Sequence, residues 1–310
     1  MDTDPGVDDA IAMLWLLALD LRFRADITGF STTEGNLRRR GTFGNAARLL
    51  ELCRRTDIRL AKSVSFKTKS NVNTKLHGAD GLAGLSTLLP KPDKLYVEAP
   101  RSPIQLDRWI NSGNNDVTLI AAGPMTNLDA AEVLAPGTLK NTRQIIAMGG
   151  SFKSGNVTPE AEFNVHFNPR AAQHVLKARA NLVLIPLDVS RQLDLNSQHL
   201  RAAGFSDDKT RICKFVTRLT KAMEKHIRNI SERHFFVHDA CAVAYAFYPE
   251  FFETVAAYVK IDTRLGLSTT GKTTIETNPH PNALVTRRIN AEGVRDKMLS
   301  DLQEFSRTLR

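Results

Sequence analysis

The chain has 310 residues, with 42 lysines and arginines against 33 aspartates and glutamates, so its formal net charge is +9 at pH 7. Its 42% apolar and 24% charged residues are typical of a globular protein and exclude a mainly disordered chain. The longest apolar run, residues 10–19, is about half as long as a bilayer requires, so no membrane association is expected.

The positive charge is spread along the chain in short clusters, such as residues 38–40. No basic stretch of five or more residues occurs, and no aromatic side chains are interleaved with the basic ones, so we expect no nucleic-acid partner. The cysteines Cys53, Cys213 and Cys241 are far apart and form no CxxC pair. Together with the lack of a secretory signal pattern, this predicts a reducing, cytoplasmic location.

Short apolar runs alternate with helical patterns along the chain. Strands are predicted at residues 26–32, 58–61, 117–123, 144–150, 182–189 and 256–262, and helices at residues 9–19, 42–54, 103–111, 169–178, 207–230, 239–247 and 290–309. Most strand runs are continuously apolar, as buried parallel strands require. The pattern predicts an α/β fold with an open, mostly parallel central sheet flanked by helices, and residues 1–310 are expected to form a single domain with a Rossmann-like core.

Polar motifs follow four of the predicted strands, after Thr32, Gly123, Gly150 and Val189. In open α/β sheets, ligands bind beyond the carboxyl ends of the strands. The sequence therefore predicts that these motifs converge on one site.

Residues 2–9, Asp-Thr-Asp-Pro-Gly-Val-Asp-Asp, place four carboxylates directly before an apolar helix. One acid is enough to cap a helix, whereas four repel one another unless a cation neutralises them. Oxygen ligands favour Ca²⁺ or Mg²⁺, but an EF-hand loop is excluded because Val7 and Met13 stand where it needs Gly and Glu. Asp2 and Asp4 have the DxD spacing of phosphoryl-transfer enzymes, so a Mg²⁺-dependent phosphatase with Asp2 as nucleophile is an alternative.

The aspartate-rich octet resembles the N-terminal signature of the nucleoside hydrolases, the inosine-uridine preferring nucleoside N-ribohydrolases. Further segments resemble that family in the same order, at residues 122–128, 148–150, 155–156, 162–164, 186–189 and 238–240. Together they extend over residues 2 to 290 or so. The resemblance implies a nucleoside hydrolase-like fold and hydrolysis of ribonucleosides to free base and ribose, in purine and pyrimidine salvage.

The resemblance also implies a site with three groups of residues. The Ca²⁺ ligands would be Asp4, Asp9, Asp239 and the main-chain carbonyl of Thr126; the substrate-binding residues would be Asn36, Met148, Asn156, Glu162 and Asn164; and the catalytic residues would be Asp8, His77 and His238. Asp8 would also contact the ribose and would take the proton of the attacking water. The two histidines would supply a proton or a hydrogen bond to the departing base.

The chain departs from the family pattern at several positions. The signature starts at Asp2, so the strand that usually precedes it is expected to be missing. Residues 62–75 are basic and polar in place of a Gly-Ala-Pro segment, and Asn168 stands where Asp is usual. Loops of this kind often gate sites, so substrate preference is expected to differ from that of better-known members.

The segment 238–240, His-Asp-Ala, resembles the subgroup with pyrimidine or broad substrate preference, and residues 222–236 show no clear aromatic stack for a purine. The family resemblance further implies a homodimer or homotetramer. A second alternative is a catalytically inactive homologue that binds a sugar or nucleoside.

Overall fold

The computed structural model describes residues 1–310 except residues 24, 65–73, 179, 206, 230–233 and 310. Its strands are β1 (Asp2–Thr3), β2 (Phe30–Thr32), β3 (Leu60–Ala61), β4 (Thr118–Ala121), β5 (Gln144–Met148), β6 (Leu182–Ile185), β7 (Phe252–Ile261), β8 (Thr273–Glu276) and β9 (Ala283–Ile289). Its α-helices are α1 (Val7–Phe23), α2 (Arg39–Leu52), α3 (Thr74–His77), α4 (Ser102–Ser112), α5 (Thr126–Leu134), α6 (Phe163–Phe167), α7 (Pro169–Lys177), α8 (Leu187–Ser190), α9 (Ser197–Ala202), α10 (Arg211–Asn229), α11 (Ala240–Phe247) and α12 (Ala291–Thr308). Short 3-10 turns lie at Ser86–Leu88, Thr138–Asn141 and Pro249–Phe251.

In the described residues, the strands form one nine-stranded sheet with the order β3-β2-β1-β4-β5-β6-β9-β7-β8. Neighbouring strands from β3 through β9 in this order are parallel. At the other edge, β7 pairs antiparallel with β9 and β8 pairs antiparallel with β7. The predicted open, mostly parallel sheet is confirmed, and its antiparallel edge is an addition to the prediction.

The central strands are buried on both faces. In β5, Ile145 and Ala147 pack into one hydrophobic cluster, whereas Ile146 and Met148 pack into the other. This alternation follows from the two-residue period of a strand. It explains why β5 reads in the sequence as a continuous apolar run.

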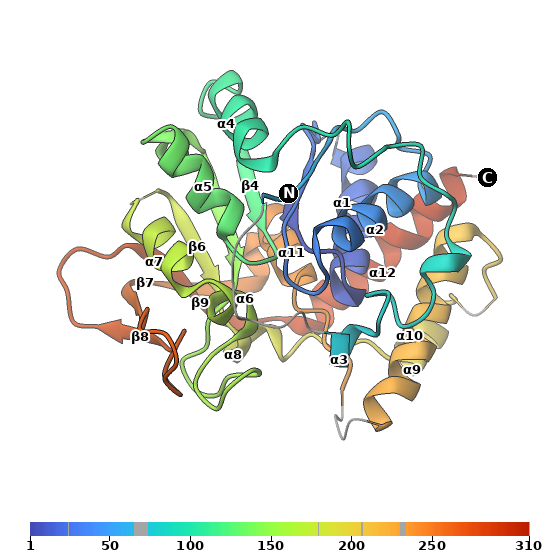
Figure 1. The fold of residues 1–310 in the computed structure, drawn as a ribbon. Coiled ribbons are helices and arrows are strands. Elements are labelled where there is room, and N and C mark those ends of the chain that lie inside the picture. Colours follow the sequence, from blue (N-terminus) through green and yellow to red (C-terminus); the bar gives the residue numbers. More distant parts are fainter. Residues whose placement is uncertain (24, 65–73, 179, 206, 230–233, 310) are drawn as a thin grey trace.

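Helices cover the two faces of the sheet, as Figure 1 shows. On one face, α5 lies between α4 and α7 and contacts both. On the other face, α1 contacts both α11 and α12, and α10 contacts α12. Residues 7–19 of α1 are all buried, which is why residues 10–19 are apolar on every face of the helix. In the described part of the chain, no helix combines the length and the apolar character needed to cross a membrane.

The absence of a strand ahead of Asp2 stays a prediction, but the aspartate-rich octet itself begins with a strand. Asp2 and Thr3 themselves form β1, which pairs with β2 on one side and β4 on the other. The main chain continues the pairing, since Ser31 N–H donates to Met1 O and Thr33 N–H to Thr3 O. The loop after β1 is therefore anchored in the middle of the sheet.

Candidate active site

The carboxyl ends of β1, β2, β4 and β5 lie side by side at one edge of the sheet. β1 leads through residues 4–6 into α1, and β2 leads into the loop 33–38. The predicted polar motifs therefore meet where the parallel strands end, as expected for ligand sites in open α/β sheets.

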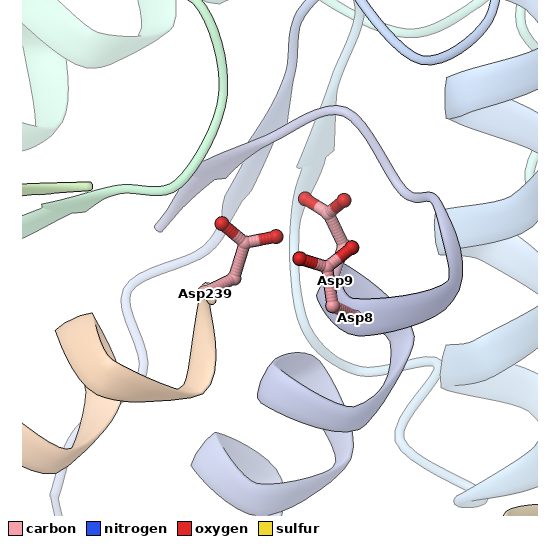
Figure 2. A group of neighbouring side chains, drawn as sticks. All are labelled: Asp8, Asp9 and Asp239. Carbon is pink, nitrogen blue, oxygen red and sulfur yellow. The ribbon is translucent and has the colours of Figure 1, made fainter. Parts of the chain in front are cut away.

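Three aspartates from two distant segments converge there. Asp8 and Asp9 lie in the first turn of α1, and Asp239 immediately precedes α11. Figure 2 shows their side chains directed toward one another, and one oxygen from each lies within 4.8 Å of the others. All three are buried. The contact depends on α11 packing against the sheet near β4 and β5.

Asp9 is tied into the loop that connects β1 to α1. Its Oδ1 accepts hydrogen bonds from Thr3 Oγ1 and from Asp4 N, the latter at 3.2 Å. Its Oδ2 accepts from Gly6 N and from Asn36 Nδ2, each at 3.0 Å. Asp9 thus holds the turn through Thr3, Asp4 and Gly6 and connects it to Asn36, which follows β2.

Asp4 has one satisfied and one unsatisfied carboxylate oxygen. Its Oδ2 accepts from the main-chain N–H of Asn36 at 2.7 Å, whereas Oδ1 is buried and has no hydrogen-bond partner. Two glycines make room for this carboxylate: a Cβ on Gly35 would lie 2.1 Å from Oδ2, and one on Gly123 would lie 2.3 Å from Oδ1. A buried anionic oxygen without a partner is costly, so Asp4 is suited to a bound cation.

The electrostatics of the acidic cluster, which consists of Asp4, Asp8, Asp9 and Asp239, also favour a bound cation. Burial, followed by the charge of Asp9, raises the pKa of Asp8 to about 7. Burial and the neighbouring acids raise the pKa of Asp4 and of Asp239 well above their ordinary value. Four carboxylates cannot all ionise here without a cation, and a donor set made of oxygen atoms suits a hard divalent ion. The residues present therefore fit the metal that the sequence implies.

Two histidines border the acidic cluster. Val7 N–H donates to His77 Nδ1 at 3.1 Å, which places the proton of the neutral ring on Nε2. His238 Nδ1 is 2.8 Å from Ser190 Oγ, so Nε2 is the ring nitrogen that this hydrogen bond does not use. Burial lowers the pKa of each histidine to about 3, with a further contribution at His238 from Arg191. Both rings are therefore neutral near pH 7.

A cavity of about 250 Å³ joins these groups. The predicted site residues that line it are Asp4, Asp8, Asn36, His77, Met148, Asn156, Glu162, Asn164, His238 and Asp239. Asp9 does not line the cavity but lies behind it, within the acidic cluster. Thr126 does not line it either: it begins α5 just after β4, and its hydroxyl accepts a hydrogen bond from Asn168.

One part of the cavity wall, formed by Glu162 and Asn164, offers hydrogen-bond acceptors. Glu162 accepts the main-chain N–H groups of Gly150, Asn164 and Val165 at 2.8–3.0 Å. Asn164 donates through Nδ2 to Ala122 O and Met148 O, which leaves its amide oxygen as an acceptor. Such a wall is suited to hydroxyl groups, which can donate to these acceptors.

Another part of the cavity wall is apolar and aromatic, and sequence reasoning missed it. Met223 and Ile227 of α10 line the cavity together with Phe235 and Phe236. The ring centroids of Phe236 and His238 are 5.5 Å apart. The i, i+4 spacing on α10 was an available signal, but it is the same signal that any core-facing helix gives. Residues 230–233, in the segment where we expected no aromatic stack, lie outside the described residues.

Arg191 also lines the cavity without having been predicted. It directly follows α8 and donates hydrogen bonds to the loop that carries Asn156. Of the basic segment 62–75, residues 65–73 lie outside the described part of the chain, so its expected effect on substrate preference stays a prediction.

The geometry does not favour the phosphatase alternative. Asp2 is fully buried and does not line the cavity. Its Oδ1 accepts hydrogen bonds from Ser31 Oγ at 2.6 Å and Asn127 Nδ2 at 2.8 Å. A carboxylate held in this way cannot reach a phosphoryl group in the cavity.

Comparisons with known proteins agree with this geometry. Residues 1–296 match the family model described as inosine-uridine preferring nucleoside hydrolase. The pyrimidine-specific ribonucleoside hydrolase RihA of Escherichia coli is 30% identical over 321 residues, covering 98% of this chain and 97% of the relative. A solved plant nucleoside hydrolase is 26% identical with a TM-score of 0.84, covering 97% of both chains. The purine-preferring ribonucleoside hydrolase of Gardnerella vaginalis has the same fold, with a TM-score of 0.88 at 22% identity over 99% of this chain and 98% of that chain. The chain belongs to the inosine-uridine preferring nucleoside hydrolase family and is a nucleoside N-ribohydrolase.

Proposed function

We propose that the protein is a Ca²⁺-dependent ribonucleoside hydrolase that prefers pyrimidine nucleosides or accepts a broad range. The observation that carries the metal dependence is the buried, unpartnered Oδ1 of Asp4 beside three further buried carboxylates. The pyrimidine preference is supported by the similarity to RihA, which is described as pyrimidine-specific.

The carboxylates of Asp4, Asp9 and Asp239 would hold the ion, and the main-chain carbonyl of Thr126 is proposed as a further ligand. A bound divalent cation lowers the pKa of a water molecule in its coordination sphere, which makes that water a better nucleophile near neutral pH. Ca²⁺ is proposed over Mg²⁺ because it accepts six to eight or so oxygen ligands, enough for protein, water and sugar together.

Asp8 is the proposed general base. Its carboxylate lines the cavity and lies within the acidic cluster, and neither Val7 N–H nor His77 Nδ1 is available to it, since they bond each other. Asn156, Glu162 and Asn164, with Asn36 and Met148, would surround the ribose. Hydrogen bonds that strengthen as the sugar flattens toward an oxocarbenium-like transition state would favour bond cleavage.

The base would depart toward the wall formed by Phe236, Met223 and Ile227. The lowered pKa of His77 and His238 favours a neutral hydrogen-bond donor over a charged acid at pH 7. A donor placed at the departing base stabilises the negative charge that develops on its nitrogen or oxygen. In this proposal, both histidines act through Nε2–H.

Cellular location and assembly are also proposals. The three cysteines are buried and form no disulfide bond, which supports a reducing, cytoplasmic location. A homodimer or homotetramer is proposed on the family resemblance and is tested by sedimentation velocity. Nucleoside salvage would be the corresponding cellular role.

The experiment is a ribose-release assay with uridine, cytidine, inosine and adenosine, on protein depleted of metal and then supplied with Ca²⁺ or Mg²⁺. We expect release that requires Ca²⁺ and is fastest with uridine or cytidine. Release that is faster with a purine nucleoside would overturn the preference, and equal release with Mg²⁺ alone would overturn the Ca²⁺ dependence. No release, together with nucleoside-dependent thermal stabilisation, would show the inactive binding homologue. Hydrolysis of p-nitrophenyl phosphate would instead support the phosphatase alternative.

A further inference from the structure

Both Nη atoms of the Arg191 guanidinium donate hydrogen bonds to the loop that carries Asn156. Its Nη1 donates to Ser154 O at 2.7 Å and to Ser154 Oγ at 2.8 Å, and its Nη2 donates to Gly155 O at 2.7 Å. The Gly155 carbonyl belongs to the peptide that joins Gly155 to Asn156. The guanidinium therefore holds the peptide plane immediately before a proposed ribose-binding residue.

The loop around Asn156 is a tight turn with little packing of its own. Gly155 N–H donates to Pro159 O and Asn156 N–H donates to Ala161 O, at 2.9 and 3.1 Å. A Cβ on Gly155 would lie 2.2 Å from Ala161 O, so the turn has no room for a side chain there. Asn156 itself is exposed. Because hydrophobic burial does not hold Asn156, hydrogen bonds must set its position.

The orientation of the Asn156 side chain is also defined. Its Oδ1 accepts the main-chain N–H of Phe163 at 2.9 Å. The amide Nδ2 is therefore the group that Asn156 can present to a ligand in the cavity, as a donor to a hydroxyl oxygen. A shift of the preceding peptide would move this donor.

We propose that Arg191 is a positioning residue of the ribose site, which fixes the Gly155–Asn156 peptide so that Asn156 Nδ2 meets a sugar hydroxyl. The inference rests on the proposed ribose-binding role of Asn156. An arginine suits this position because its planar fork donates to two carbonyl groups at once, which a lysine ammonium does not reproduce.

Two residues close to Arg191 in the sequence, Asp188 and Ser190, also form hydrogen bonds near the cavity. Asp188 Oδ2 accepts the main-chain N–H of Phe152 at 2.8 Å, and Ser190 Oγ bonds His238 Nδ1 at 2.8 Å. The short segment 188–191 thus contacts both the loop that carries Asn156 and the proposed catalytic residue His238.

The test is a double-mutant cycle in the Ca²⁺-loaded enzyme, with Arg191→Ala, Asn156→Ala and the double variant, assayed with the best substrate of the wild type. Arg191→Ala is expected to lower kcat/KM about ten- to a hundredfold, the effect of losing one well-placed hydrogen bond or a pair of them. In the Asn156→Ala background, the same change is expected to have less than a twofold effect, because Arg191 acts through Asn156. Arg191→Lys is expected to fall between wild type and Arg191→Ala.

The matched control is Arg143→Ala, which removes an exposed arginine far from the cavity and is expected to leave kcat and KM unchanged. A general loss of folded enzyme would lower kcat without changing KM and would persist in the Asn156→Ala background. Equal effects of Arg191→Ala in both backgrounds, or none in the wild type, would overturn the inference. A wild type without ribose release on any nucleoside would instead contradict the proposed function, so the two failures are distinct.

Discussion

The main-chain N–H of Val7 donates to Nδ1 of His77, 3.1 Å away, across 70 residues of sequence. His77 Nδ1 also lies 3.9 Å from Asp8 Oδ1. Because Nδ1 accepts a hydrogen bond, it carries no proton, and the contact with Asp8 is not an ion pair. The first turn of α1 thus sets the tautomer of His77 while it also carries the acidic cluster.

The tautomer leads to a prediction for His77→Gln. Glutamine keeps an acceptor and a donor but has no ring to titrate, so kcat/KM is expected to fall about tenfold or more, while the shape of its pH profile from pH 5 to 8 stays that of the wild type. Steady-state kinetics at several pH values measure both quantities. If an acidic limb of the wild-type profile disappeared in the variant, His77 would be a titrating acid.

Asp8→Asn tests the proposed base. Loss of a general base is expected to lower kcat by about 10²- to 10⁴-fold. Because Asp4, Asp9 and Asp239 are the proposed ligands, addition of Ca²⁺ is expected to raise the melting temperature of the variant, as in the wild type. Near-normal turnover would refute the assignment, and a variant that no longer responds to Ca²⁺ would identify Asp8 as a ligand instead.

Asp4→Asn is expected to act in opposite directions with and without metal. Burial raises the pKa of Asp4, so at pH 7 the metal-free fold is destabilised relative to the unfolded chain, in which this carboxyl ionises freely. The neutral amide avoids that cost, and the variant is expected to melt at a higher temperature than the wild type in chelator but to gain little from Ca²⁺. Thermal unfolding in chelator and in excess Ca²⁺ measures both effects. A variant that melts below the wild type in chelator would contradict this account.

Gly35→Ala tests the space around the Asp4 carboxylate, because the new Cβ would lie 2.1 Å from Asp4 Oδ2. We expect the stabilisation by Ca²⁺ to be lost, as judged by melting temperature. The matched control is Gly44→Ala in α2, where a Cβ meets nothing within 4 Å. The control is expected to retain the Ca²⁺ response and to gain about 0.5–1 kcal/mol of stability from helix propensity. Equal Ca²⁺ responses in the two variants would show that Asp4 has room to move.

Asp80→Asn is expected to show a pH-dependent loss of stability. Partial burial alone would raise the pKa of Asp80, but the N–H groups of Ser86, Gly84 and Leu82 lower it below its ordinary value. The stabilisation is therefore fully present above the unfolded pKa of about 4 and is lost as pH falls through the folded pKa. Denaturant unfolding is expected to show the variant about 1 kcal/mol less stable at pH 7, since the carboxylate is partly solvated, and little different at pH 2.

The exposed Asp93→Asn variant is the control for Asp80→Asn and is expected to match the wild type at both pH values. A stability difference for Asp80→Asn that is the same at pH 7 and pH 2 would show that ionisation of Asp80 is not its source.

The sequence predicted the central strands well because burial on both faces leaves a direct mark in them. Residues 145–148 are apolar at successive positions, as a strand between two helical layers requires. At the antiparallel edge, β7 was predicted in part, at residues 256–262, but β8 and β9 left no comparable mark. β8 has four residues, Thr-Thr-Ile-Glu, which are partly exposed, and β9 contains the exposed Arg287 and Arg288. Pairing with neighbouring strands, and not their own composition, decides that such segments form strands.

By itself, the sequence determined that acidic and polar groups gather at the ends of the parallel strands. Four acids before an apolar helix, and polar motifs at the ends of apolar strands, follow from local composition and order. Only the tertiary structure brought Asp239 to Asp8, since that contact requires α11 to pack on the sheet. The tertiary structure alone placed Arg191 and Phe236 at the cavity. Neither the arginine after a short helix nor the phenylalanine two residues before His238 carries a local signal of what it will contact. Their neighbours are distant in sequence, and long-range packing decides those contacts.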